Sequence, residues 1–433
     1  MIESINIKNY KSILDLSFDV GRVNVLIGEN GCGKSNILEA LTLAGAAEAN
    51  KLDNEFLSSR GIRATSAHLM RSAFNPDKNE SIEISIQLIG EDDSEPPYKL
   101  QNDNQPYSKW ILTPRRQFSL KLSPSELETI RNLSKEVSNN SEKIRKTIQI
   151  LQFLASSQAE EIDIESLSNT NEADKDTLKK SRLKVSNTTE LNIFAHNESE
   201  STVAKVHGRE YLARIIIYSP EETALRNLYQ EGQIEPLGIH GEGLLKLLKV
   251  LVENESAPSL EAIRESLSLL DWFQNISISD DDSVGILDEL KVILSDRFIE
   301  AKFDQRSANE GFLFILFYSA LMVSEDTPKI FAIDNVDASL NPKLCTKVMS
   351  DIVKLAKQFD KQCFLTTHNP AILDGLNLGD DEQRLFVVTR NRKGHTRLKR
   401  ITVESKPVSS TGEELKLSEA FLRGYLGGLP KNF

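Results

Sequence analysis

Residues 28–35 of the chain read Gly28-Glu29-Asn30-Gly31-Cys32-Gly33-Lys34-Ser35, with glycine on both sides of a four-residue spacer and lysine and serine directly after it. The segment before this run, residues 23–27, is apolar apart from one asparagine. The segment after it, residues 35–47, carries apolar side chains at helical spacing. The pattern predicts a strand, a glycine-rich turn and a helix, in that order.

A turn of this kind has the chemistry of a phosphate-binding loop. Glycine lets the backbone approach an anion closely, and the N–H groups at the start of a helix attract negative charge. Lys34 is expected to reach the β- and γ-phosphates of ATP, and the Ser35 hydroxyl is expected to bind Mg²⁺. The predicted ATP contacts are Asn30, Gly31, Cys32, Gly33, Lys34, Ser35 and Asn36.

Composition and charge narrow the class of protein. The chain has 433 residues and a net charge of −12, so any contact with DNA must be local or belong to a partner. Its longest apolar stretch, Gly311 to Val323, falls short of the roughly 18 residues that mark a membrane-spanning helix. The N-terminus has no apolar signal core, and the three cysteines form no CxxC pair. We predict a cytoplasmic protein that does not enter a membrane.

Two apolar segments in the last third of the chain end in polar side chains. Residues 330–333 are apolar and run into Asp334, which we expect to support the Mg²⁺ shell. The second segment, residues 362–366, leads into Thr367 and His368. Both segments are predicted to be strands of the sheet that carries the phosphate loop.

The order of these features resembles that of ATP-binding-cassette proteins. Asn36 directly after the loop, and the opening run from Ile7 to Ser12, are similar to the SMC, RecF and OLD-type branch. The sharp signature of transporter subunits is missing. The resemblance implies an α/β fold, namely an ABC-type (SMC/RecF/OLD-like) ATPase head with an antiparallel β subdomain, a helical signature lobe and a helical insertion.

The resemblance also implies roles for individual residues. In related ATPases a glutamate after the strand aspartate polarises the attacking water, and Asn335 occupies that position here. An amide can hold a water molecule but cannot accept its proton, so we expect hydrolysis to be slow or absent. Asp337, two residues later, is interpreted as structural rather than as a replacement base. His368 is expected to contact the γ-phosphate and to report its presence.

A degenerate signature is expected at Asn309-Glu310-Gly311, where asparagine can still cap a helix. A competing alignment uses Ser307. In related heads this segment contacts the γ-phosphate bound to the opposite subunit. The resemblance therefore implies a head-to-head dimer, or a higher oligomer of such dimers, with two composite ATP sites.

Further residues are closer to the PtuA family, the ATPase subunits of Septu-type anti-phage systems. They are the pair Asp334-Asn335, the run Ser339-Leu340-Asn341-Pro342 and the tail from Gly424 to Phe433. This resemblance implies a regulatory subunit that gates a separate HNH-type nuclease and reaches DNA through that complex. The alternative is an active RecF/SMC-like repair ATPase that clamps DNA. The basic segment 384–402 fits either a phosphate-backbone contact or a solvated hairpin.

Four regions are expected. Residues 1–123 form the first ATPase lobe, 124–206 a helical and partly flexible insertion, and 207–325 a helical signature lobe. Residues 326–433 complete the first lobe with the acidic strand, the histidine switch, the basic hairpin and a C-terminal helix. Residues 237–299 of the signature lobe are expected to be helical.

Overall fold

In the computed structural model, two compact units account for the chain. The first comprises Met1–Leu112 together with Arg209–Phe433, and the second is Thr113–Gly208. The expected insertion, residues 124–206, lies within the second unit. The residues that the structure describes are 1–90, 96–105, 108–113, 118–122, 161–162, 183–193, 209, 211–226, 234–253, 257–280, 290–407 and 415–429.

A six-stranded sheet forms the centre of the first unit. Its strands, in spatial order, are β10 (Ile217–Tyr218), β14 (Ile330–Ile333), β15 (Gln362–Thr367), β3 (Val23–Ile27), β16 (Gln383–Arg390) and β17 (Thr396–Ile401). All pair in parallel except β17, which is antiparallel to β16. Val25 and Leu26 of β3 are both buried and belong to the hydrophobic cores on opposite faces of the sheet. Strands covered on both faces need such continuous apolar sequence.

The register of these strands brings distant parts of the sequence to one edge. Thr367 at the end of β15 pairs with Ile27 at the end of β3, and Ile333 of β14 pairs with Leu365 of β15. The phosphate loop, Asp334 and His368 each follow directly after one of these strands. Because parallel strands have their carboxyl ends at the same edge, the three lie together there.

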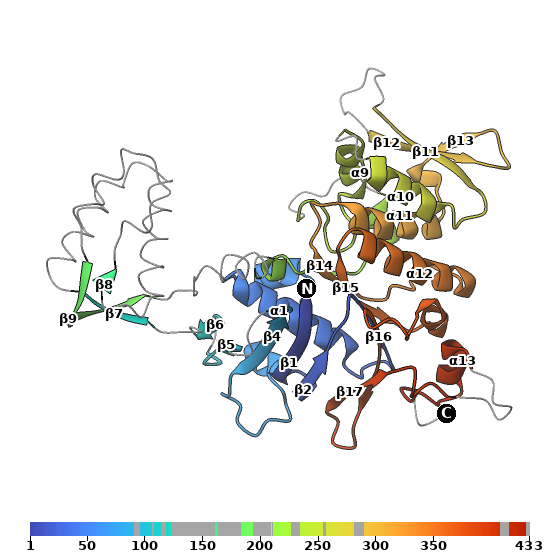
Figure 1. Cartoon of the computed structure of the whole chain (residues 1–433). Coiled ribbons are helices and arrows are strands. Elements are labelled where there is room, and N and C mark those ends of the chain that lie inside the picture. Colours follow the sequence, from blue (N-terminus) through green and yellow to red (C-terminus); the bar gives the residue numbers. More distant parts are fainter. Residues whose placement is uncertain are drawn as a thin grey trace, which may run out of the picture. The chain divides into compact units, whose positions relative to one another are not determined.

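One face of the central sheet is covered by α1 (Lys34–Glu48), which also packs on an antiparallel sheet near the N-terminus (Figure 1). That second sheet has the order β2 (Ile13–Asp19), β1 (Ile2–Tyr10), β4 (Ile82–Leu88), β5 (Tyr98–Gln101) and β6 (Ile111–Thr113). Two short helices, α2 (Asn54–Ser59) and α3 (Ala67–Met70), connect α1 to β4. The predicted antiparallel subdomain is therefore confirmed.

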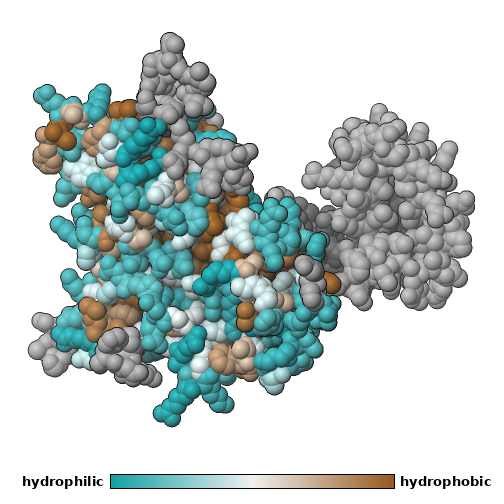
Figure 2. Space-filling view, turned by 180° about the vertical axis from the view of Figure 1, so that it is seen from behind, coloured by the Kyte–Doolittle hydropathy of each residue, from teal (hydrophilic) through white to brown (hydrophobic). Residues whose placement is uncertain are grey.

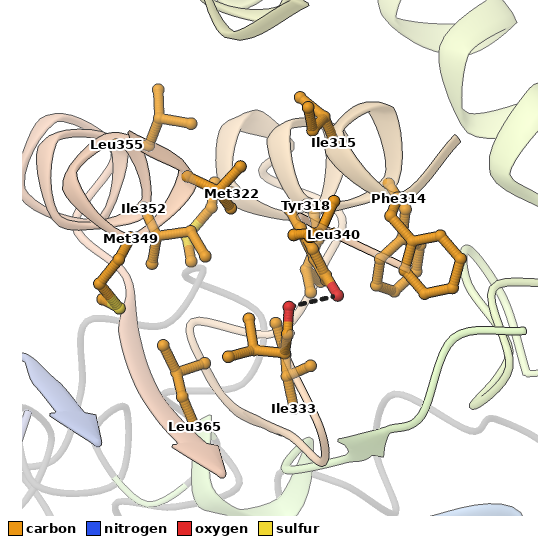
Figure 3. Packing of buried hydrophobic residues seen from close by; sticks show 14 of the residues in the cluster. Phe314, Ile315, Tyr318, Met322, Ile333, Leu340, Met349, Ile352, Leu355 and Leu365 are labelled. Carbon is orange, nitrogen blue, oxygen red and sulfur yellow. Dashed lines mark hydrogen bonds between the residues drawn. The ribbon is translucent and has the colours of Figure 1, made fainter. Parts of the chain in front are cut away.

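The other face is covered by helices whose bounds are α8 (Glu222–Leu225), α9 (Leu244–Glu253), α10 (Ala257–Leu267), α11 (Glu310–Val323) and α12 (Pro342–Gln358). Every residue of α11 from Phe312 to Val323 is buried, which accounts for its continuous apolar sequence. Figure 3 shows side chains of α11 and α12 meeting Ile333 and Leu365 from the central strands. The Tyr318 hydroxyl of α11 donates to the Val336 carbonyl at 3.0 Å, just after the acidic strand.

The expectation that residues 237–299 are helical is wrong in its second half. A three-stranded antiparallel sheet occupies this part, with β11 (Phe273–Asp280), β12 (Leu290–Asp296) and β13 (Lys302–Asp304). Residues 275–279 alternate between isoleucine and small polar residues, which is the period of a strand. A short 3₁₀ turn, η2 (Gln305–Ser307), then leads to α11.

The C-terminal part of the first unit contains η3 (Pro370–Gly375) and α13 (Leu417–Leu422). η3 packs against both α12 and α13, and Figure 1 shows these two helices on the same side of β15 and β16. The basic segment predicted as a hairpin is β16 and β17, so it is an edge of the central sheet.

The second unit contains a described antiparallel arrangement of β7 (Phe118–Leu122), β9 (Leu183–Ile193) and β8 (Glu161–Ile162), in that order. A helical assignment therefore does not hold for β8 and β9. The other positions of the expected helical insertion, 124–206, lie outside the described residues.

Hydrophilic residues cover most of the face of the first unit seen in Figure 2, and apolar residues form small separate groups on it. Among the residues that the structure describes, no helix combines the length and apolar character needed to cross a bilayer.

Candidate functional site

The phosphate loop connects β3 to α1. It contacts β17, the last strand of the central sheet, through Thr396. Gly33 has φ 111°, and a Cβ atom on it would lie 2.2 Å from Thr396 Oγ1 of β17. Only glycine fits both this backbone conformation and this close approach. The Thr396 hydroxyl itself donates to the Cys32 carbonyl at 2.9 Å.

Lys34 begins α1 and is buried under the loop. Its ammonium donates to the Gly28 carbonyl at 2.8 Å and to the Glu29 carbonyl at 3.1 Å. Burial lowers the pKa of Lys34, whereas the nearby Cys32, Asp334 and Asp337 act in the opposite direction. The lysine therefore lies within electrostatic reach of the acidic residues after β14.

The geometry around Asp334 fits a Mg²⁺ ion. The Ser35 hydroxyl donates to Asp334 Oδ2 at 3.0 Å, and the Thr366 hydroxyl donates to the other oxygen, Oδ1. Mg²⁺ is commonly held by one or two protein oxygens together with phosphates and water. The Ser35 hydroxyl and the Asp334 carboxylate provide two such oxygens at the mouth of the phosphate loop, and the ion would there neutralise charge on a bound triphosphate.

Asn335 occupies an unusual backbone position directly after Asp334. Its φ is 60°, in the left-handed region, and its N–H donates to Thr366 Oγ1 at 2.9 Å. Asparagine is several-fold enriched in this conformation compared with most other residues that carry a Cβ. Asparagine, which stands at the predicted position of the catalytic base, is therefore a residue type that suits this left-handed backbone conformation.

Asp337 joins the loop after β14 to the loop after β15. Its Oδ1 accepts a hydrogen bond from the Thr367 hydroxyl at 2.7 Å and another from the His368 N–H at 3.2 Å. These bonds agree with the structural role expected for Asp337.

The His368 imidazole is exposed at the same edge of the sheet. Partial desolvation lowers its pKa and Lys34 lowers it further, while Asp337 and Asp334 oppose the shift. A neutral imidazole with one donor nitrogen is therefore favoured near neutral pH, which suits a hydrogen bond to a phosphate oxygen.

The predicted signature lies at the start of α11. Asn309 is the N-cap, and its side chain accepts the Phe312 N–H at 2.8 Å, whereas Ser307 ends the preceding 3₁₀ turn. Arg226 holds the segment that precedes α11, because its guanidinium donates to the carbonyls of Gln305, Arg306 and Ala308. Within the described part of the chain, no hydrogen bond or ion pair connects Asn309, Glu310 or Gly311 to residues 28–36.

Sequence reasoning missed the residues that support the loop from distant segments. Ser12, in the turn between β1 and β2, contacts both Asn36 and Thr396 at 2.7 Å. Asn36 also accepts from Arg63 at 3.4 Å, and Glu39 of α1 is buried against Lys11, Arg63 and Tyr10. The family resemblance of the run from Ile7 to Ser12 could have indicated the contact of Ser12 with Asn36. The sequence around Thr396 contains no motif that indicates its contact with the phosphate loop.

The C-terminal tail also reaches the phosphate loop. Gly428 has φ 82°, and a Cβ atom on it would lie 2.7 Å from Val387 Cγ1 and 3.5 Å from Gly28 Cα. Gly427 and Gly428 both have positive φ, and the missing side chain of Gly428 lets the tail lie close to Gly28 of the phosphate loop. The last residues of the tail, 430–433, lie outside the described part.

Comparison with known families gives one match over most of the chain. The model of the family described as "AAA domain, putative AbiEii toxin, Type IV TA system" matches residues 23–374. This range contains the phosphate loop, the start of α11, Asp334, Asn335 and His368.

Individual relatives match over shorter ranges. An uncharacterised protein of Methanocaldococcus jannaschii, MJECL10, is 32% identical over 114 residues, which are 25% of this chain and 50% of that protein. The DNA replication and repair protein RecF of Bacillus thuringiensis is 41% identical over 56 residues, 12% of this chain and 15% of RecF. The chain thus covers half or less of the length of these relatives.

Among solved structures, an SMC head bound to the C-winged helix domain of ScpA aligns with 93% of this chain and 98% of that chain, at a TM-score of 0.48 and 14% identity.

Proposed function

Since this chain belongs to the AAA-domain ATPase family whose model matches residues 23–374, we propose that it is a regulatory ATPase subunit of an anti-phage defence complex. In this proposal it binds ATP and Mg²⁺ at residues 30–36 and Asp334, hydrolyses ATP slowly or not at all, and gates a separate HNH-type nuclease.

The observation that carries this proposal is the combination of Asp334 and Asn335. Asp334 lies 3.0 Å from the Ser35 hydroxyl, as needed for a shared Mg²⁺ ion. Asn335 follows it in a left-handed conformation and offers an amide instead of a carboxylate. A site that binds the nucleotide but lacks a general base keeps ATP bound for longer, and the protein then follows nucleotide occupancy rather than cycling.

Two copies of the chain supply each complete site in the proposed arrangement. Asn309 caps a helix of 14 residues that begins with Glu310 and Gly311, and the N-terminus of this helix favours an anion. In a head-to-head dimer this terminus would approach the γ-phosphate held by the partner subunit. ATP would thereby control the distance and angle between the two heads.

The anti-phage role rests on the resemblance to PtuA, which lies in Asp334-Asn335, in residues 339–342 and in the tail. Two of these segments lie at the phosphate loop, since Gly428 of the tail approaches Gly28 and Asp334 accepts a hydrogen bond from Ser35. The nuclease is proposed to be a separate HNH-type protein that docks on the dimer, and DNA would be reached through that complex.

The test is co-purification of the chain with an HNH-type nuclease from the same locus, followed by assay of plasmid cleavage with and without ATP. ATP is expected to change cleavage by the complex, and Lys34→Ala in this chain is expected to remove that effect. Degradation of plasmid DNA by the isolated chain with Mg²⁺ alone, surviving re-purification, would overturn this division of labour.

A second candidate is a DNA-clamping repair ATPase, which the 56-residue match to RecF supports. The two candidates differ in turnover. A repair clamp should hydrolyse ATP faster when duplex DNA is added, whereas the regulatory subunit alone should show the same slow rate with and without DNA.

A further inference from the structure

Arg226, directly after α8, connects that helix to the segment before α11 through its guanidinium. Its Nε and Nη2 donate to Glu222 Oε1 at 3.0 Å and 2.7 Å. Its Nη1 donates to the carbonyls of Gln305 and Arg306, both at 2.9 Å, and Nη2 also donates to the Ala308 carbonyl at 2.7 Å. These bonds engage all five N–H donors that a guanidinium has. The side chain is therefore placed to hold other protein groups in position.

The segment that Arg226 holds is short and irregular. It consists of the 3₁₀ turn η2 followed by Ala308 and Asn309, which are extended, with ψ of 148° and 156°. On its other side it is attached to β12, because Gln305 Oε1 accepts the Val292 N–H at 2.9 Å. Three carbonyl oxygens that point toward one place repel one another unless a cation lies between them. The guanidinium therefore stabilises the path that brings Asn309 to the start of α11.

α8 is attached in turn to the strand beside Asp334. Its N-cap, Glu221, comes three residues after Tyr218, the last residue of β10. The Tyr218 carbonyl accepts the Asp334 N–H at 2.8 Å, and the Glu221 N–H donates to the His240 carbonyl at 2.9 Å. α8 also packs against α11. A short path of hydrogen bonds and packed elements therefore leads from Asp334 to the start of α11.

We propose that Arg226 is a positioning residue for the contact between subunits, which holds the start of α11 where it meets the γ-phosphate bound by a second copy of this chain. The inference rests on the proposed function, because it needs the head-to-head dimer. It adds the residue that connects the ATP site of each chain to the surface that the same chain offers to its partner. Binding of ATP and Mg²⁺ at Asp334 is then coupled to the position of Asn309, and by linkage dimerisation is coupled to ATP affinity.

The planar fork of arginine, and not its charge alone, serves this position. Lysine is also positive, but its three donors leave a single nitrogen and cannot reach Glu222 and three separate carbonyls together. Arg226→Lys therefore keeps the net charge and loosens the segment before α11. All the donors of Arg226 go to α8 and to residues 305–308, so the phosphate loop keeps its own contacts in this variant.

The test compares Arg226→Lys with the parent by sedimentation velocity in Mg²⁺ and ATP. Arg226→Lys is expected to weaken dimerisation about tenfold or more, because hydrogen bonds from a charged donor are lost. A fluorescent ATP analogue, at protein concentrations too low for dimerisation, is expected to bind with an affinity within about twofold of the parent. Arg264→Lys is the matched control, because Arg264 of α10 forms an exposed pair with Glu261 at 3.8 Å.

Two further measurements separate positioning from a general loss of stability. Amide hydrogen exchange of the ATP-free chain is expected to be about tenfold faster over residues 305–313 in Arg226→Lys, and unchanged in α12. The double variant of Arg226→Lys with Asn309→Ala is expected to dimerise as weakly as the weaker single variant, because both substitutions act on the start of α11. Additive losses in the double variant, or faster exchange throughout the first unit, would overturn the positioning role.

The remaining outcomes distinguish this inference from the proposed function. Dimerisation of Arg226→Lys with the affinity of the parent overturns the inference and leaves the proposed dimer intact. A parent that stays monomeric with Mg²⁺ and ATP overturns the proposed dimer, and the inference with it. A loss of ATP affinity as large as the loss of dimerisation would place the effect of Arg226 in the ATP site of its own chain, which also overturns the inference.

Discussion

At position 335 the backbone and the chemistry of ATP hydrolysis favour different residues. A φ of 60° is tolerated by asparagine, whose short side chain can hydrogen-bond locally. Glutamate would provide a carboxylate for proton transfer, but it is less suited to this conformation. The asparagine present here fits the backbone conformation, and in the proposed function it provides no general base.

The left-handed conformation can be tested by stability. Asn335→Ala is expected to lower the free energy of unfolding by about 1 kcal/mol, because alanine is strained at this φ. Asn335→Gly is the control, since it also removes the amide but adopts the conformation freely. Equal denaturant midpoints for the two variants would mean that backbone strain does not select the residue.

We expect Mg²⁺-dependent ATP binding to depend most on Lys34. Lys34→Ala is expected to remove this binding in titration calorimetry at micromolar ATP, because it deletes the buried cation of the phosphate loop. Lys354→Ala, on α12 and away from the loop, should bind as the parent does. Unchanged affinity in Lys34→Ala would place the nucleotide elsewhere.

At the scale of elements, the phosphate loop depends on strand β17. Thr396→Val keeps the side-chain shape but removes the hydrogen bonds to Cys32 and Ser12. We expect ATP affinity to fall about fivefold to tenfold, in line with roughly 1–1.4 kcal/mol for such contacts. Thr42→Val removes a buried hydroxyl within α1, bonded at 3.0 Å to Leu38, and should leave affinity unchanged. An equal effect of both substitutions would mean that β17 does not position the loop.

Helix α11 makes a separate prediction about assembly. Asn309→Ala is expected to remove a cap worth about 1 kcal/mol and also to weaken ATP-dependent dimerisation, measured by sedimentation velocity. Asp53→Ala removes an equivalent cap from α2, where Asp53 accepts the Phe56 N–H at 2.9 Å. If both variants dimerise as the parent does, the start of α11 is not part of the interface.

Local sequence patterns predicted the elements with regular periodicity and the residues within one motif. The strand, loop and helix around Lys34 and the strand before Asp334 are present as expected. β11 was not predicted. Its alternating pattern covers only a short segment, and the helical pattern of the segments before it was extended over it. Thr366 and Thr396 were missed as site residues, because their roles depend on strand order and register, which local periodicity does not encode.

For the whole molecule, the two units differ in what they contribute to ATP binding. All predicted ATP and Mg²⁺ contacts lie in the first unit, and residues 113–208 form a unit with its own contacts. Replacing residues 114–208 by a short flexible linker is expected to leave the dissociation constant for ATP within about twofold. Loss of cooperative unfolding in that variant would show that the second unit is needed for the fold of the first.

The slow ATP hydrolysis that we propose depends on Asn335, and phosphate release by the purified chain at saturating Mg²⁺ and ATP tests this proposal most directly. Asn335→Glu is compared with the parent, with Lys34→Ala as the blank. We expect slow or undetectable turnover in the parent and an increase of about tenfold or more in Asn335→Glu, since a general base contributes roughly 10²–10⁴-fold and backbone strain offsets part of the gain. A parent that turns over several times per second, with no change in Asn335→Glu, would contradict the account and make Asp337 the first base to examine.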